Sequence, residues 1–316
     1  MRLNKNITIN KYIIMKCCWN SIAIMNQPTS SSSFDNEISE VDIEYLNFDV
    51  KKFEHKLLGE GHNGKCYKII MDNKEYTCKK IDSSKNNKFH REVKILKNLT
   101  TTEHLPEYFN SFSNLTYHYI LYNYIEGDDL YQCLQNGFIK KGDKTKCLTI
   151  IKNITDGLFE LFNNNLVHLD IKLENIILTN KDPIKIKIID LESCRKINKN
   201  TKKIRCGTPG YVSPEILLQK SYYYNTDVWS VGVILFMLFT HYNFIEKEFF
   251  TTQGECLEFF EDYNEKFIKK RFLLTECFDQ DIFELLKLML HKLHVYRISI
   301  HGLIKHKLIS SIQEDK

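Results

Sequence analysis

The sequence predicts an α+β fold of two unlike lobes, a small antiparallel β-rich lobe followed by a larger helical lobe. Two observations predict it. Patterns typical of strands, with one helix among them, fill residues 53–122, and patterns typical of helices fill residues 126–308. The two kinds of element do not alternate regularly, as they would around a parallel sheet. A cleft between two such lobes is a common place for a ligand to bind.

The first lobe is predicted to contain five strands and one helix. The expected strands are Phe53–Leu58, Lys65–Met71, Glu75–Ile81, Glu107–Phe112 and Tyr117–Tyr122. The second and third strands are separated by the turn sequence Asp-Asn-Lys at 72–74. The helix, Lys88–Leu99, is indicated by apolar residues that recur every three or four positions.

The second lobe is predicted to be built on three main helices. They are Thr145–Phe162, Val228–Thr240 and Asp281–Leu293. The first has one apolar stripe, which is typical of a helix with one face on the core. The second is apolar nearly all round, and we expect it to be buried on most sides.

The ends of the chain are expected to lie outside the folded domain. Residues 1–52 read as a disordered leader and linker, and residues 309–316 as a short tail. The folded domain is expected to span 53–308, with lobes at about 53–122 and 126–308 and a hinge at 123–125.

Composition and charge exclude several classes of protein. The net charge of +4 is too small to indicate a nucleic-acid-binding surface. The ten cysteines contain no C-x-x-C pair, so neither a zinc site nor a disulfide framework is expected. No apolar run reaches the about 18 residues of a membrane span, and no convincing signal peptide is present. We therefore expect an intracellular protein, cytoplasmic or nuclear, without membrane association; the sequence leaves its oligomeric state open.

A glycine-rich loop follows the first predicted strand. It reads Gly59, Glu60, Gly61, His62, Asn63 and Gly64. Glycines at this spacing let the backbone approach a phosphate and point N–H groups at it. A strand follows the loop, whereas a dinucleotide-binding fold requires a helix there. A loose hairpin turn is the alternative interpretation.

Lys79 and Glu92 form a second candidate pair. A lysine on a strand can hold phosphate oxygens as a point charge if a carboxylate on a helix orients it. Lys79 lies in the third predicted strand and Glu92 in the predicted helix. Each residue alone would be read as a solvated surface charge.

The third pattern carries the chemistry of a reaction. Asp170 and Asn175 lie five residues apart, and Asp190 follows two predominantly apolar stretches. In this spacing one carboxylate can meet a hydroxyl nucleophile, while the amide and the second acid hold a divalent metal beside phosphates. A polar loop without function is the alternative, which the joint spacing makes improbable.

These patterns, together with Gly207-Thr208-Pro209 and the later Asp227 and Arg297, occur in the order found in eukaryotic-type protein kinases. The chain resembles that family over about Phe53 to Leu308. Asp170-Ile171-Lys172 and Gly207-Thr208-Pro209 resemble the serine/threonine class, and Cys206–Glu215 is most similar to the calmodulin-dependent group. The resemblance implies the two-lobed kinase fold, ATP and Mg²⁺ as cofactors, and serine or threonine hydroxyls of proteins as acceptors.

The resemblance also implies roles for individual residues. Asp170 would be the catalytic base, and Lys172 would steady the transferred phosphoryl group. Asn175 and Asp190 would ligate Mg²⁺. Lys79 would contact the α- and β-phosphates with Glu92 as its partner, under a loop formed by residues 59–64.

The adenine pocket and the structural contacts are implied in the same way. The residues around adenine would be Leu58, Cys66, Thr77 and Ile177, with Asn123, Tyr124 and Ile125 along its edge. Leu96, Tyr108, His168 and Leu191 would stack on one another, anchored by Asp227. Glu215 and Arg297 would form a buried ion pair.

The sequence departs from the family pattern at several positions, of which three bear on activity. Leu169 stands where an arginine usually precedes the catalytic aspartate, and Ile204 stands at the usual phosphate-accepting position. We therefore predict that activity does not depend on phosphorylation of this segment. Glu192 replaces a glycine that tolerates unusual backbone angles. Glu192 and Leu169 favour the alternative of a pseudokinase, a nucleotide-binding scaffold without turnover.

Two acidic residues bear on the choice of substrate. Asp129 and Glu174 match positions that contact an upstream arginine of the substrate in basic-directed kinases. A preference for basic substrates is therefore one hypothesis. Two solvated carboxylates with no role in recognition are the alternative.

Overall fold

The computed structural model describes residues 48–61, 64–99, 103–197, 204, 206–245 and 253–312. The prediction of a disordered leader therefore falls mostly outside the described residues, as do His62, Asn63 and the end of the predicted tail.

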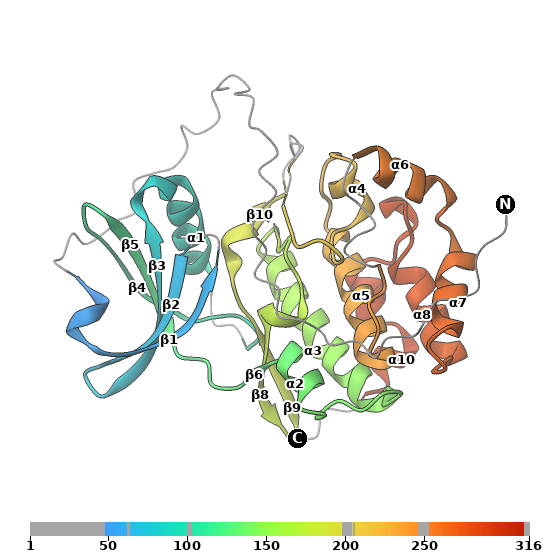
Figure 1. Cartoon of the computed structure of the whole chain (residues 1–316), viewed down its shortest axis with the longest axis horizontal. Helices are drawn as coiled ribbons and strands as arrows, with labels where there is room; N and C mark the ends of the chain where they lie inside the picture. The colour runs from blue at the N-terminus through green and yellow to red at the C-terminus, as the bar shows by residue number, and fades with distance from the viewer. Residues whose placement is uncertain are drawn as a thin grey trace, which may run out of the picture. The chain divides into compact units, whose positions relative to one another are not determined.

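The first lobe is a five-stranded antiparallel sheet with the strand order β1-β2-β3-β5-β4 (Figure 1). Its strands are β1 (Glu54–Gly61), β2 (Gly64–Met71), β3 (Lys74–Asp82), β4 (Tyr108–Ser113) and β5 (Tyr117–Asn123). All five predicted strands are confirmed. The predicted turn between β2 and β3 is also confirmed: Asp72 and Asn73 have φ angles of 50° and 60°, which a two-residue type I′ hairpin requires.

The helix of the first lobe, α1 (Asn86–Asn98), confirms the predicted helix. Its buried apolar residues Phe89, Val93 and Leu96 belong to one cluster with Ile81 and Ile120 of the sheet. The spacing of these residues along the helix puts them on a single face. The same face carries Glu92, which is also buried, so packing fixes where this carboxylate points.

The packed structure begins earlier than Phe53. Phe48 stacks on Phe112, with 4.6 Å between the ring centroids, and Val50 is buried in the same cluster. Val50 is the first residue of the short 3-10 helix η1 (Val50–Lys52), which precedes β1 and is capped by the carboxylate of Asp49. Phe48 and Val50, which are predicted to belong to the leader, therefore pack in the same cluster as Phe112 and Tyr119 of the sheet.

The second lobe is mainly helical, as predicted. Its helices are α2 (Leu130–Gln135), α3 (Lys144–Asn163), α4 (Pro214–Leu217), α5 (Thr226–Thr240), α6 (Gln253–Asp262), α7 (Glu265–Leu273), α8 (Gln280–Met289), α9 (Ile300–Ile304) and α10 (Lys307–Ser310). Every residue of α5 is buried, which confirms the prediction from its apolar composition. The helix α3 packs against α5 and against the strand β9.

The helix predicted to reach Leu293 ends at Met289. Leu290 leaves the helical conformation, with φ −100° and ψ 26°, and the 3-10 turn η6 (His294–Tyr296) follows. The carbonyl of Leu288 accepts a hydrogen bond from the N–H of Ile298, and the carbonyl of Leu290 accepts one from the hydroxyl of Tyr263. These partners lie outside the helix and satisfy carbonyls at its end. The helix can therefore stop at Met289 although the apolar pattern in the sequence continues to Leu293.

Two small sheets position the predicted motifs. One contains β6 (Asp128–Asp129), β8 (Ile176–Lys181) and β9 (Ile184–Ile188), and the other pairs β7 (Leu166–Val167) with β10 (Arg195–Lys196). The segment from β7 to β10 contains both the Asp170 motif and Asp190. Pairing of its two ends brings the start of the first motif next to the residues that follow the second.

We expect His118 to make the stability of the protein depend on pH. Its ring stacks on Phe89 at 4.3 Å, and its Nδ1 lies 2.7 Å from the hydroxyl of Ser113. Burial, and then the nearby His90, lower the pKa of His118 below its ordinary value of 6.5. The unfolded chain therefore binds more protons just below pH 6.5, and stability falls as the pH falls through this range. Replacing His118 with Phe keeps the stacking and removes the titration.

The measurement is the free energy of unfolding by urea at pH 7.0, 6.0 and 5.0. The loss between pH 7.0 and 5.0 should be smaller in His118→Phe than in the wild type. An equal or larger loss in the variant would contradict the prediction.

Candidate active site

Lys79 lies at the centre of a buried cluster of charges. It is in the middle of β3, between β2 and β5. Its Nζ lies 2.9 and 3.0 Å from the two carboxylate oxygens of Glu92, and 2.8 Å from Oδ1 of Asp190. The expected pairing of Lys79 with Glu92 is therefore present. Burial alone would lower the pKa of Lys79, but the surrounding carboxylates outweigh it and raise the pKa, so the ammonium is charged.

Asp227 holds the start of the Asp170 motif in place. Its two carboxylate oxygens accept hydrogen bonds from the backbone N–H groups of His168 and Leu169, at 2.6 and 2.8 Å. The expected anchoring by Asp227 is thus observed, and the bonds are to the backbone. The aspartate fixes the turn on which Asp170 is carried.

Asn175 connects Asp170 to the segment that carries Asp190. Its side-chain nitrogen donates to the carbonyl of Asp170 at 2.9 Å and lies 3.4 Å from Oδ2 of the same residue. Its own carbonyl accepts a hydrogen bond from the N–H of Ile189 at 2.8 Å. Asp190 follows in a left-handed conformation, with φ 64° and ψ 72°. Residues that lie up to 20 positions apart in the sequence are therefore tied into one site.

Thr208 joins Asp170 and Lys172. Its hydroxyl donates to Oδ1 of Asp170 at 2.7 Å, and Nζ of Lys172 lies 3.1 Å from this hydroxyl and 3.4 Å from Oδ2 of Asp170. From the sequence, Thr208 is only a mark of the serine/threonine class. Its contact with Asp170 adds it to the candidate site residues, and the Gly207-Thr208-Pro209 motif is the signal that points to it.

The charges of the cluster fit a divalent cation. The carboxylates of Glu92, Asp190 and Glu192 lie within 4.8 Å of one another, and two ammonium groups, those of Lys79 and Lys88, pair with them. The side chain of Asp190 is the open one, 39% exposed. Burial alone would raise the pKa of Asp190, but Lys79 outweighs it and lowers the pKa to about 2.

Asp190 is therefore ionised, whereas burial raises the pKa of Glu92 to about 7. A carboxylate oxygen of Asp190 and the amide oxygen of Asn175 are hard ligands of the kind that Mg²⁺ prefers. The residues present fit a magnesium ion.

The three glycines of the loop differ in how much space surrounds them. Gly59 and Gly61, in β1, have open space where a side chain would begin. A Cβ on Gly64 would lie 2.1 Å from the carbonyl oxygen of Lys80. The close approach of β3 is thus sufficient reason for a glycine at 64. Glu60 pairs with Lys65 at 3.1 Å on the surface. The phosphate-binding role of the loop stays a prediction, because His62 and Asn63 lie outside the described residues.

The expected adenine residues come from several elements. Leu58 is exposed on β1, Cys66 is half-buried on β2, Thr77 is buried on β3 and Ile177 is half-buried on β8. They come from both lobes, as an adenine pocket between the lobes requires. Their contact with a nucleotide stays a prediction.

The strand β5 includes Asn123, which the sequence analysis places in the hinge. Its side chain donates to Oε2 of Glu107 at 2.7 Å, and its backbone N–H donates to the carbonyl of the same residue at 3.1 Å. The N–H of Tyr124 donates to the carbonyl of Glu75 at 3.2 Å. Of the three expected hinge residues, Ile125 is therefore the one whose N–H we expect to donate to the edge of a base.

Leu169 and Ile204 pack in the same apolar cluster. Val167, Leu169, Ile216 and Tyr222 form its buried part, and Ile204 and Cys206 are among the half-buried residues against it. The resemblance implies an arginine and a phosphate acceptor at positions 169 and 204. In this chain both positions belong to one apolar cluster, and hydrophobic packing needs no modification.

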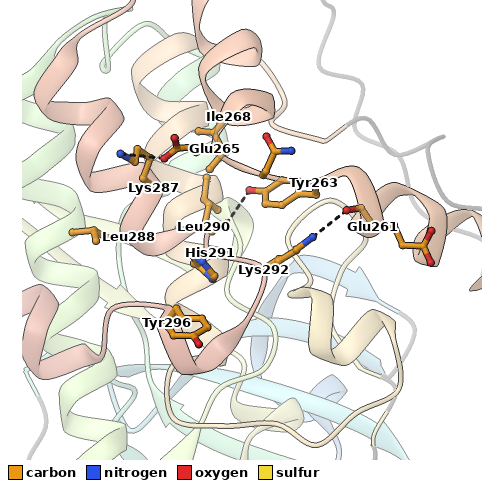
Figure 2. Close-up of a pocket in the computed structure, with 11 residues that line it drawn as sticks. Glu261, Tyr263, Glu265, Ile268, Lys287, Leu288, Leu290, His291, Lys292 and Tyr296 are labelled. Atoms are coloured by element: carbon orange, nitrogen blue, oxygen red, sulfur yellow. Dashed lines mark hydrogen bonds and ion pairs between the residues drawn. The ribbon is translucent and has the colours of Figure 1, made fainter.

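A separate pocket lies among the helices of the second lobe (Figure 2). Its volume is about 390 Å³, and residues of α6, α7, α8 and η6 surround it. The hydroxyl of Tyr263 and the ammonium of Lys292 each donate to a backbone carbonyl at its wall. No predicted site residue lines this pocket, so it is not the candidate active site.

Comparison with known protein families identifies the family of this chain. The family model described as "Protein kinase domain" matches residues 53–309. The chain belongs to the protein kinase family. The expectations of a kinase fold and of a eukaryotic-type serine/threonine class are confirmed by this match and by the relatives. In the described part of this kinase, no helix has both the length and the apolar character needed to cross a membrane.

The relatives come from more than one subgroup. The chain is 31% identical to "Probable serine/threonine-protein kinase 2" of Plasmodium falciparum, over 60% of the chain and 37% of that protein. It is 31% identical to "Aurora kinase" of Yarrowia lipolytica, over 61% and 53%. It is 30% identical to "Calcium/calmodulin-dependent protein kinase type 1" of Caenorhabditis elegans, over 52% and 47%. The matches thus span about half of these relatives or less, and the assignment to one subgroup stays a prediction.

Proposed function

We propose that this kinase transfers the γ-phosphate of ATP to serine and threonine hydroxyls of proteins, with Mg²⁺ as its metal. The observation that carries the proposal is the connection of two groups of residues. Lys79, bound to Glu92, reaches Asp190, and the segment of Asp190 is hydrogen-bonded through Asn175 to Asp170. The family generally uses ATP and Mg²⁺, and this arrangement supports the same cofactors here.

Asp170 would orient the acceptor hydroxyl and take its proton. Thr208 donates a hydrogen bond to Oδ1, and Asn175 approaches Oδ2, so the carboxylate is held in a fixed position. Lys172, 3.4 Å from Oδ2, would place a positive charge beside the transferred group. A fixed carboxylate and a fixed cation need no reorganisation when charge moves during transfer.

Lys79 and Glu92 would hold the nucleotide end of the reaction. The ammonium of Lys79 is charged and is bound by both oxygens of Glu92, which leaves a point charge at a defined place for phosphate oxygens. Asp190 and Asn175 would hold the metal. When bound, Mg²⁺ supplies neutralisation of the charge on the phosphates.

The hypothesis of a basic substrate preference is supported by only one of its two residues. The carboxylate of Asp129 caps α2, where it accepts the N–H of Gln132 at 2.7 Å in a reciprocal capping box. This role accounts for an acid at 129 without a substrate. Glu174 is exposed and adjoins α2 through the turn η3 (Leu173–Asn175). A degenerate peptide array tests the hypothesis, and equal labelling of basic and acidic peptides would dispose of it.

The two features that favour a pseudokinase leave the charged residues in place. Leu169 has a left-handed backbone, with φ 68°, but its side chain is buried in the apolar cluster. Glu192 is not among the described residues with positive φ, so its position does not require a glycine. The charged groups needed for transfer lie together despite both changes.

The test is incubation of the full chain with labelled ATP, Mg²⁺ and a basic protein that contains serine and threonine. We expect Mg²⁺-dependent label on these residues. Nucleotide binding without transfer, measured by calorimetry on the same preparation, would favour the scaffold over the enzyme.

Activity is expected to be independent of phosphorylation next to the site. Ser193 lies in the turn after Asp190, and Thr201 lies outside the described residues. Because apolar contacts hold Leu169 and Ile204, changing both Ser193 and Thr201 to Ala should alter the initial rate less than about twofold. The measurement compares the initial rates of the untreated wild type, the phosphatase-treated wild type and the double variant. A fall of two orders of magnitude would refute the prediction.

A further inference from the structure

Glu192 is a buried carboxylate that connects β3 to α1. Its side chain is 8% exposed, one oxygen lies 3.0 Å from Nζ of Lys88, and the other lies 3.4 Å from Nζ of Lys79. Lys88 and Glu92 are four residues apart on α1, so they lie one above the other on the same face of the helix. The helix α1 is thus tied to the segment that carries Asp190 directly through Lys88, and indirectly through Glu92, whose partner Lys79 also binds Asp190.

The turn that carries Glu192 is itself fixed. Residues 191–193 form the 3-10 turn η4 directly after Asp190. One guanidinium nitrogen of Arg195 donates to the carbonyls of Glu192, Ser193 and Cys194, at 3.1, 2.9 and 2.8 Å. A carboxylate on a turn braced in this way is a fixed anchor for the more flexible lysine side chain.

We propose that Glu192 is a positioning residue, which holds α1 against the Asp190 segment through Lys88 and so keeps Glu92 on Lys79. This inference rests on the proposed function, since it concerns the geometry of the same site. It gives a role to the residue at which the chain departs from its family. It also explains how α1 is kept in place when the segment has an apolar contact, and not a phosphate, at residues 169 and 204.

The physics favours a role for Lys88 as well as for Lys79. The Lys88 side chain is 41% exposed, so its ammonium gives up only part of its hydration to reach Glu192. The carboxylate itself is buried and depends on both ammonium groups for compensation. Removing Lys88 therefore frees Glu192 from the α1 side alone, and α1 then holds Glu92 on Lys79 less firmly.

The experiment uses the full chain with Glu192→Gln, Lys88→Met and the double variant. Glu284→Gln is the matched control, because it alters an exposed ion pair with Lys287 on α8, away from the site. The first readout is hydrogen exchange of the amides of residues 86–98 without nucleotide. The second is kcat and the KM for ATP.

Both single variants should exchange the amides of α1 about tenfold faster than the wild type and the control. Both should lower kcat/KM for ATP about tenfold, mostly in kcat, because misplaced Glu92 leaves Lys79 without its orienting partner. The kcat/KM of the double variant should be at most about threefold lower than that of either single variant, since the two residues act as one unit. The conservative change Lys88→Arg should restore both readouts.

The proposal is overturned if Lys88→Met leaves the exchange of α1 unchanged, or if the effects of the two variants simply multiply. Should Glu192→Gln fail to fold, the Lys88→Met and Lys88→Arg pair still decides, because that side chain lies at the surface. A third outcome separates the two proposals. If the variants exchange the amides of α1 faster than the wild type, but neither they nor the wild type transfer phosphate, the role of Glu192 is upheld and the proposed function is refuted.

Discussion

Replacing Asp170 with Asn is expected to lower kcat by about 10³-fold, within the range that a positioned general base contributes. The amide has the shape of the carboxylate, and its oxygen can accept a hydrogen bond either from Thr208 or, when flipped, from Asn175, so the local structure is largely preserved. It cannot take the proton of the acceptor. Because Lys79 and Asp190 are untouched, the affinity for Mg²⁺ and nucleotide should change less than threefold. Initial rates with labelled ATP and calorimetric titration with nucleotide measure the two quantities.

The matched control for this variant is Asp156→Asn. Asp156 lies on α3, where it pairs with Lys152 at 2.9 Å on the outside of the helix. Its replacement should leave kcat within about twofold of the wild type. A rate above a tenth of the wild type in Asp170→Asn would argue that Asp170 does not act as the base.

Replacing Arg297 with Met is expected to lower the free energy of unfolding by about 3–5 kcal/mol. Two guanidinium nitrogens donate to the two oxygens of Glu215, each at 2.8 Å, and the side chains are 0% and 4% exposed. The expected buried pair is thus confirmed. Burial alone would raise the pKa of Glu215, but Arg297 outweighs it and lowers the pKa. Without the arginine a buried carboxylate has no counter-charge, which is where most of the cost arises.

Urea denaturation at pH 7 measures the loss, and the double variant Glu215→Gln/Arg297→Met provides the comparison. Removing the carboxylate as well should recover part of the stability, because no charge is then buried alone. The pair contributes most above pH 4.5, the ordinary value for Glu215, and its contribution falls as the pH drops through the lowered value of the folded state. A loss below about 1 kcal/mol at pH 7 would contradict the prediction.

Much of the fold could be predicted from the sequence because its long elements bury one regular face. The apolar spacing in α1 and the all-apolar α5 are examples. The strands β6, β7 and β10 have two residues each, which is too short for any periodicity to appear. The packing of Phe48 could not be predicted either, because it depends on a contact with Phe112, 64 residues later in the sequence.

The candidate site also has a part that the sequence predicts and a part that it does not. The residue types and their order point to Lys79, Asp170 and Asp190, since the chemistry of phosphate transfer requires them. The packing reason for Gly64 depends on the carbonyl of Lys80, and the role of Glu192 depends on Lys88. Such reasons lie in distances between atoms on different elements. A departure from the family pattern therefore shows where to look, and only the three-dimensional structure gives its meaning.

The apolar seat shared by Leu169 and Ile204 has a consequence for control in the cell. Apolar packing involves no covalent modification, so a phosphatase cannot reverse it. Salts such as sulfate strengthen apolar packing, whereas salt weakens an ion pair by screening it. Output would then scale with the abundance of the protein and with which hydroxyls come within its reach. Activity would then be controlled by the synthesis, degradation and location of the protein, and not by phosphorylation of this segment.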